Sequence, residues 1–252
     1  MRINRKIAAL GGLLSGLLLA SPNASAQDMP VMDWITPQIE ADRMGQMLGV
    51  DRNGNKLDDD KPAGTKAAAG TRPANARPVS LAYTPSPALK AQTVQGYVTR
   101  LKAKNPAAAQ AVATNFGPGK YDYGTIYRGL IQGTGLGENN AADALSAYMI
   151  LGWMIANNVQ DGKAITPAIG RGVRAQFAPK LAATPKLTAP GVPAQLGEEM
   201  KLLFVTVQGG WQAAIKENAL PAYQEGVGAM FKNQYGMDMR LFKLTDQGFA
   251  KK

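Results

Sequence analysis

The residues best spaced for chemistry lie in one short polar loop, residues 51–60. Oxygen atoms recur there at every second position, and hard oxygen ligands at this spacing suit Ca²⁺. The five residues at the alternate positions are Asp51, Asn53, Asn55, Leu57 (through its backbone carbonyl) and Asp59. The spacing therefore predicts a calcium site formed by these five residues.

Two departures from the calcium pattern leave a second interpretation open. Lys56 stands at the sixth position, where such loops use glycine, and a left-handed conformation costs a non-glycine residue roughly 1–2 kcal/mol. Pro62 stands at the twelfth, where a bidentate carboxylate is expected. The loop resembles the short calcium loops of dockerin and thrombospondin type-3 repeats, although it occurs once. The alternative is an Asn-Gly turn inside a polar linker.

Carboxylate pairs are the next candidates, because glycoside cleavage uses two carboxyl groups roughly 5–10 Å apart. Glu138 and Asp143 flank the start of the most apolar segment, and Glu198 and Glu199 stand in the expected first turn of another helix. Acidic side chains at a helix start also interact favourably with the helix dipole. Since no spacing selects either pair, we predict no catalytic residue, and no cofactor besides calcium.

Two further segments favour structural interpretations. The glycines of residues 133–137 have no preceding strand and no following Lys-Ser/Thr, so they predict a turn and no nucleotide. Tyr121, Tyr123 and Tyr127 lie beside basic residues and can stack on sugars or bases, but their helical spacing favours the core.

The chain contains no cysteine and no histidine. This excludes disulfides, Ser-His-Asp triads, Cys-His pairs and histidine-ligated metals. Any catalysis must then use carboxylates, lysine, tyrosine or serine.

The N-terminus has the three parts of a secretory signal peptide. Arg2, Arg5 and Lys6 precede an apolar run over residues 7–20, and Ala24-Ser25-Ala26 follows as a cleavage site. The run is shorter than the roughly 20 residues of a spanning helix. We expect export to the periplasm or the extracellular space, cleavage near Ala26, and no transmembrane anchor after cleavage.

Charge and composition divide the remaining chain into three parts. Residues 27–60 form a short acidic segment with a net charge of −5, and residues 61–80, rich in Pro, Ala and Gly, predict a disordered basic linker. Residues 81–252 predict the compact domain, and residues 86–252 alone carry a net charge of +8. A basic domain favours an anionic envelope polymer or protein as partner.

Helical periodicity and start signals run through residues 81–252. Ser86-Pro87, Asn105-Pro106 and Thr166-Pro167 each read as an N-cap followed by proline in the first turn. Residues 140–159 are apolar nearly all round and predict a central helix, while Pro179 should kink or shorten another. We predict an all-α fold: a single bundle of six or seven helices, preceded by the signal peptide and the disordered linker.

We predict structural roles for two polar residues near the start of the central helix and for one segment near the C-terminus. Asn140 is expected to cap the central helix, and Asp143 to accept a hydrogen bond or pair with a base inside the bundle, because buried polar groups need partners. Residues 244–249 are expected to form a capped turn that returns Phe249 to the core.

Three segments of residues 83–249 carry a resemblance: Tyr83-Thr84-Pro85-Ser86, Asn139-Asn140-Ala141-Ala142-Asp143-Ala144, and Leu244-Thr245-Asp246-Gln247-Gly248-Phe249. With Trp153, their order resembles a family of secreted bacterial proteins known as a domain of unknown function. The resemblance implies a signal peptide, a proline-rich linker and a helical domain, and it implies no activity. The leading hypothesis is a non-catalytic exported domain that binds a macromolecule. The alternative is a carboxylate-dependent hydrolase or lyase acting on cell-wall or other polysaccharide.

Overall fold

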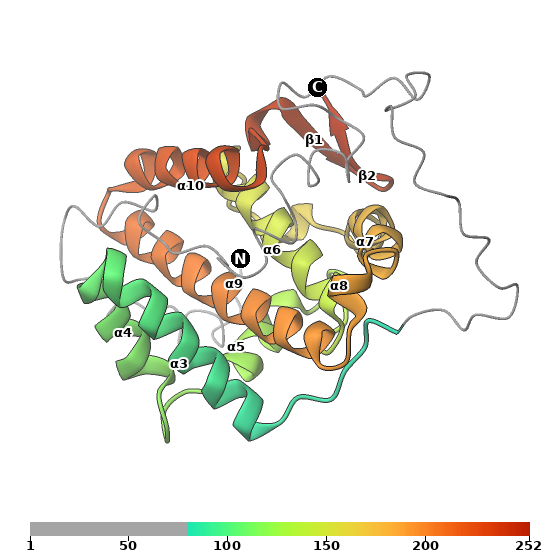
Figure 1. Ribbon diagram of the computed structural model, residues 1–252. Coiled ribbons are helices and arrows are strands. Elements are labelled where there is room, and N and C mark those ends of the chain that lie inside the picture. Colours follow the sequence, from blue (N-terminus) through green and yellow to red (C-terminus); the bar gives the residue numbers. More distant parts are fainter. Residues whose placement is uncertain (1–79) are drawn as a thin grey trace, which may run out of the picture.

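The computed structural model describes residues 80–252, and this part of the chain is mainly helical (Figure 1). The helices are α3 (Pro87–Lys104), α4 (Pro106–Phe116), α5 (Tyr123–Ile131), α6 (Ala141–Ala156), α7 (Pro167–Ala182), α8 (Pro185–Thr188), α9 (Val192–Lys216) and α10 (Leu220–Tyr235). Two short 3₁₀ turns, η3 (Gly162–Ala164) and η4 (Met239–Leu241), and two strands, β1 (Phe242–Thr245) and β2 (Gly248–Lys251), complete the fold. The predicted helical bundle is confirmed, although the described residues have eight helices where six or seven were expected, and a small two-stranded sheet besides.

Helix α9 is the longest helix of the described residues and lies in the middle of the bundle (Figure 1). It packs most extensively on α6, and α3, α5 and α10 also pack against it. Helix α4 packs on α3, and α7 packs on α6. Because α8 packs against α9 as well, five helices surround it, and a polar side chain that α9 turns inward must find its partner inside the protein.

The predicted helix starts are confirmed. The side chains of Ser86, Asn105 and Thr166 each accept a hydrogen bond from a backbone N–H of the first turn of α3, α4 and α7. Asn140 caps α6, since its Oδ1 accepts from the N–H groups of Ala142 at 2.9 Å and Asp143 at 3.3 Å. A cap of this type stabilises a helix by roughly 1 kcal/mol.

Helix α6 forms the centre of the core. Every residue from Ala141 to Gly152 is buried, as its all-round apolar composition predicts. Gly152 lets α10 approach closely, because a Cβ at this position would lie 2.2 Å from the ring of Phe231. The helix ends at Ala156, Asn157 is its C-cap, and Asn158 takes a left-handed φ of 55°.

The C-terminal segment contains the expected turn, and two strands that were not predicted extend it into an antiparallel hairpin over residues 242–251. Thr245 Oγ1 accepts from the N–H of Gln247 at 3.2 Å, and Phe249 is buried as expected. Trp153 Nε1 donates to the carbonyl of Phe242 at 2.8 Å. The side-chain amide of Gln176 bonds both backbone groups of Phe249, donating to its carbonyl at 2.9 Å and accepting from its N–H at 2.8 Å. The hairpin is therefore held to α6 and α7 by side chains.

Helix α7 continues through Pro179 to Ala182, so the proline does not shorten it. The signal peptide, the acidic segment and nearly all of the linker lie outside the described residues, and so do the candidate calcium ligands Asp51, Asn53, Asn55, Leu57 and Asp59. Within residues 80–252, no helix has the length and apolarity needed to cross a membrane.

Candidate functional site

The most unusual side chains of the described domain are Glu198 and Lys201, one turn apart on α9. Both are 0% exposed, and they form an ion pair with each other. A charge without water must be paired and hydrogen-bonded, since an isolated buried charge is very costly. The surroundings of this pair therefore decide whether it is a stable structural element or a reactive one.

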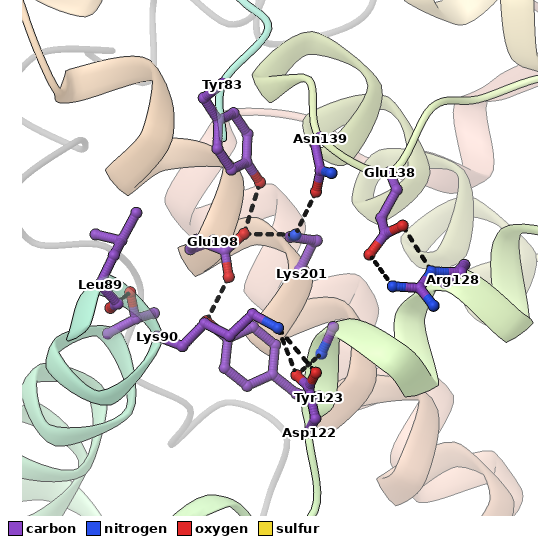
Figure 2. A network of polar contacts seen from close by, with 12 residues as sticks. Tyr83, Leu89, Lys90, Asp122, Tyr123, Arg128, Glu138, Asn139, Glu198 and Lys201 are labelled. Carbon is purple, nitrogen blue, oxygen red and sulfur yellow. Dashed lines mark hydrogen bonds and ion pairs between the residues drawn. The ribbon is translucent and has the colours of Figure 1, made fainter. Parts of the chain in front are cut away.

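Side chains from three other segments form hydrogen bonds with the two charged groups of the pair (Figure 2). The hydroxyl of Tyr83 donates to Glu198 Oε1 at 2.9 Å, and that of Tyr123 donates to Glu198 Oε2 at 2.7 Å. Lys201 Nζ donates to Asn139 Oδ1 at 3.3 Å. Tyr83 precedes α3, Tyr123 begins α5 and Asn139 precedes α6, so the pair joins three segments that are distant in sequence.

The aromatic rings add a second contribution. Lys201 Nζ lies 5.4 Å from the ring centre of Tyr83 and 6.0 Å from that of Tyr127, within the range of a cation–π interaction. Burial and the nearby Glu198 carboxylate raise the pKa of both Tyr83 and Tyr123 above the ordinary value for tyrosine. Both phenols therefore stay protonated and act as hydrogen-bond donors.

Two further ion pairs lie in the same region (Figure 2). Lys90 Nζ lies 2.8 Å from both carboxylate oxygens of Asp122. Burial pushes the pKa of Asp122 up, but hydrogen bonds from Lys90 and from the backbone of Gly124 outweigh it and hold that pKa below its usual value. The Lys90–Asp122 pair therefore joins α3 to the start of α5.

The Arg128 and Glu138 pair is bidentate, with N–O distances of 2.6 and 2.9 Å. These hydrogen bonds lower the pKa of Glu138, and the side chain of Arg128 is 61% exposed. The pair therefore lies at the surface edge of the region.

The other predicted acids have separate partners. Asp143 forms an ion pair with Arg174 of α7, with Nε 2.8 Å from Oδ1, which confirms its expected role inside the bundle. Glu199 pairs with Arg100 of α3. Burial raises the pKa of Asp143 above its ordinary value, and Arg174 only partly offsets this effect.

The expected carboxylate pairs are not brought together as pairs. Glu138 and Asp143 bind different arginines, and the adjacent Glu198 and Glu199 bind different bases. The prediction that Glu198 and Glu199 stand in a first helical turn is wrong, because α9 begins at Val192. They stand in the second turn and are buried, so their role is ion pairing inside the fold.

Sequence reasoning missed Lys201 and Asn139 and read Tyr123 as core. The signal available was the Glu-x-x-Lys spacing of Glu198 and Lys201, which commonly marks an exposed pair on a helix surface. The apolar residues around it should have indicated burial. Of the tyrosines that follow Lys120, Tyr123 and Tyr127 are buried as expected, whereas Tyr121 is 48% exposed.

The arrangement is chemically saturated. Both oxygens of Glu198 accept hydrogen bonds, and the group is closed to solvent. Within residues 80–252, three or more carboxylates never lie close enough together to hold a metal ion. The cluster joins segments of the fold, and its carboxylate and ammonium groups are buried.

Comparison with known proteins adds no relative: no family model, no curated protein and no solved structure matches the chain.

Proposed function

We propose that residues 80–252 form a non-catalytic domain that binds an anionic macromolecule of the cell envelope. The observation that carries this proposal is that ion pairs take up a larger share of the acidic residues than of the basic residues. The domain has eighteen Lys and Arg residues and ten Asp and Glu residues. Six of each form ion pairs with one another within residues 80–252.

Ion pairs between two described residues use six of the ten acids and six of the eighteen bases. The acids outside them are Asp161, Glu217, Glu225 and Asp246. Exposed bases outside them include Lys102, Lys104, Lys120, Lys163, Arg171, Lys186, Lys232 and Lys243. A surface with such an excess attracts polyanions and steers their approach.

The test measures binding of the full chain to polygalacturonate and to neutral dextran by calorimetry at two salt concentrations. We expect binding to the polyanion alone, weakened about tenfold or more between roughly 50 and 200 mM salt. Lys102→Glu with Lys104→Glu should weaken binding more than the matched Lys→Gln pair. Equal binding to dextran, or binding that ignores salt, would contradict the proposal.

Export is part of the same proposal. The basic, apolar and small-residue parts of residues 1–26 support secretion to the periplasm or the extracellular space. Intact mass of the protein in the exported fraction should show cleavage near Ala26. A protein retained in the cytoplasm at full length would contradict this part.

One observation favours the alternative, a carboxylate-dependent hydrolase or lyase acting on cell-wall or other polysaccharide. Glu198, Lys201 and Tyr123 converge at one place. General acid–base catalysis requires the carboxyl group to reach the substrate, and Glu198 is fully buried. Release of reducing ends from polysaccharide by the wild type, and not by Glu198→Gln, would favour the alternative over binding.

A further inference from the structure

The side-chain amine of Lys201 contacts both a carboxylate and a side-chain amide (Figure 2). It forms the ion pair with Glu198, and it donates a hydrogen bond to Asn139 Oδ1 at 3.3 Å. An amine, an amide carbon and a carboxylate in contact are the three groups needed to join two side chains through an amide bond. The amine is the nucleophile, the amide carbon is attacked, and the carboxylate moves the protons.

The fold holds the amide of Asn139 in place through the backbone on both sides of it. The carbonyl of Asn139 accepts from the N–H of Tyr83 at 3.0 Å. The two neighbouring residues are also fixed, since Glu138 forms the bidentate pair with Arg128 and Asn140 caps α6. An amide held against an amine in this way avoids the entropy cost of bringing the two groups together.

The surroundings of Lys201 exclude water from the amine. Lys201 and Glu198 are both 0% exposed, and the rings of Tyr83 and Tyr127 lie 5.4 and 6.0 Å from Nζ. Transfer of one proton from the ammonium to the carboxylate removes both buried charges and leaves a neutral amine, which an interior without water favours. Asn139 is half-buried, so a small group released from its side chain can reach solvent.

We propose that Lys201 and Asn139 form a covalent isopeptide bond inside the folded domain, with Glu198 as the general base and acid. Glu198 takes a proton from the ammonium, and the neutral Nζ attacks Cγ of Asn139. The Nζ–Cγ bond forms and the Cγ–Nδ2 bond breaks, while Glu198 gives a proton to Nδ2, which leaves as ammonia. Nζ passes its second proton to Glu198, which ends as a neutral carboxylic acid.

The bond would join the segment before α6 to α9, between residues 62 positions apart in the sequence. The chain has no cysteine, so no disulfide can make such a link. A cross-link of this kind stabilises a fold chiefly by restricting the unfolded chain. This inference is independent of the proposed binding function.

Tryptic peptide mapping of the folded full-length protein tests the bond. Trypsin does not cleave after an acylated lysine, so residues 187–216 would stay in one piece, joined to residues 129–163. The branched product weighs less than the two pieces together by one ammonia, about 17 Da. Ammonia lost elsewhere in the chain, for example by cyclisation of an N-terminal glutamine, would leave the two pieces separate.

The main control is Asn139→Ala, because it removes the attacked carbon and leaves the ion pair intact. We expect the branched peptide from the wild type and none from Asn139→Ala. Asn139→Asp should give the same branched peptide, with loss of water in place of ammonia. Glu198→Gln should lower the early yield after refolding about tenfold or more, and circular dichroism checks that each variant folds.

Cleavage after Lys201 in the folded wild type, which releases residues 187–201 and 202–216 separately, would overturn the inference. A branched peptide from Asn139→Ala would overturn it too, since another residue would then be the acceptor. An undiminished early yield from Glu198→Gln would refute the role of Glu198. If Glu198→Gln does not fold, the comparison of the wild type with the two Asn139 variants decides whether the bond exists.

Discussion

Two buried acidic side chains of the core differ in where their ion-pair partner lies and in how much water reaches it. Glu198 on α9 pairs with Lys201 of its own helix, and both side chains are 0% exposed. Asp143 on α6 pairs with Arg174 of a neighbouring helix, and the exposed fractions of the two side chains are 9% and 42%. The Glu198–Lys201 pair is shielded from water on all sides, whereas water reaches Arg174 of the Asp143–Arg174 pair.

The fold depends on these two ion pairs to different degrees. A partly exposed pair contributes little beyond its local contacts, because water screens it. A fully buried pair contributes weakly as a pair, but removal of one partner leaves an uncompensated charge. The α9 pair is therefore the more sensitive point of the molecule.

The largest expected effect comes from Lys201→Met. The variant leaves the Glu198 carboxylate buried without its cation, at a cost of roughly 3–5 kcal/mol. For a domain of this size the melting temperature should fall by about 6 °C or more, as calorimetry can measure. The double variant Glu198→Gln/Lys201→Met should recover part of the loss. A melting temperature unchanged by Lys201→Met would contradict the role of the pair.

Asp143→Ala should have a smaller effect, about 1 kcal/mol, because its partner is partly exposed. Arg174→Ala is the matched control, and a double-mutant cycle between the two isolates their coupling. An unchanged melting temperature for Asp143→Ala would show that the ion pair has no structural role.

The pH dependence of stability should have opposite signs at Asp143 and Glu138. The pKa of Asp143 is raised in the fold, so its contribution is largest below about pH 3.9 and declines as pH rises toward the folded pKa. The pKa of Glu138 is lowered, so its contribution is present above about pH 4.3 and lost as pH falls through the folded pKa. Urea titrations of Asp143→Asn and Glu138→Gln against the wild type test this, and equal signs would refute it.

Tyr127→Phe should have the smallest effect on stability. The hydroxyl of Tyr127 is buried and has no hydrogen-bond partner within the described part of the chain, so its removal should be neutral or slightly stabilising. Tyr123→Phe is the matched control and should cost roughly 1–3 kcal/mol, because it removes a hydrogen bond to a buried carboxylate. Equal losses from both would indicate a partner for Tyr127.

Calcium binding at residues 51–60 stays a prediction, since these residues lie outside the described part. Calorimetric titration should show heat of calcium binding below millimolar concentration, and Asp51→Asn should reduce it. No heat in that range would leave the Asn-Gly turn as the interpretation.

Much of the fold could be predicted because its signals are local. Ser86-Pro87 and Thr166-Pro167 fix helix starts within a few residues, and Asn140 caps α6 as expected. The hairpin was missed because four-residue strands are too short to show a clear alternation. The tyrosines of the Glu198 cluster were missed as its partners because Tyr123 and Tyr83 lie 75 and 115 residues away in the sequence.

The bonds that Gln176 and Trp153 make to the hairpin have a consequence for the chain outside its own fold. A two-stranded sheet has two open edges, and unpaired backbone groups at an edge can recruit strands of other molecules into aggregates. Here an amide on one side and an indole on the other occupy outward-facing groups of Phe249 and Phe242. These side chains therefore take up one backbone group on the β1 edge and two on the β2 edge, which leaves fewer groups for another strand to bind.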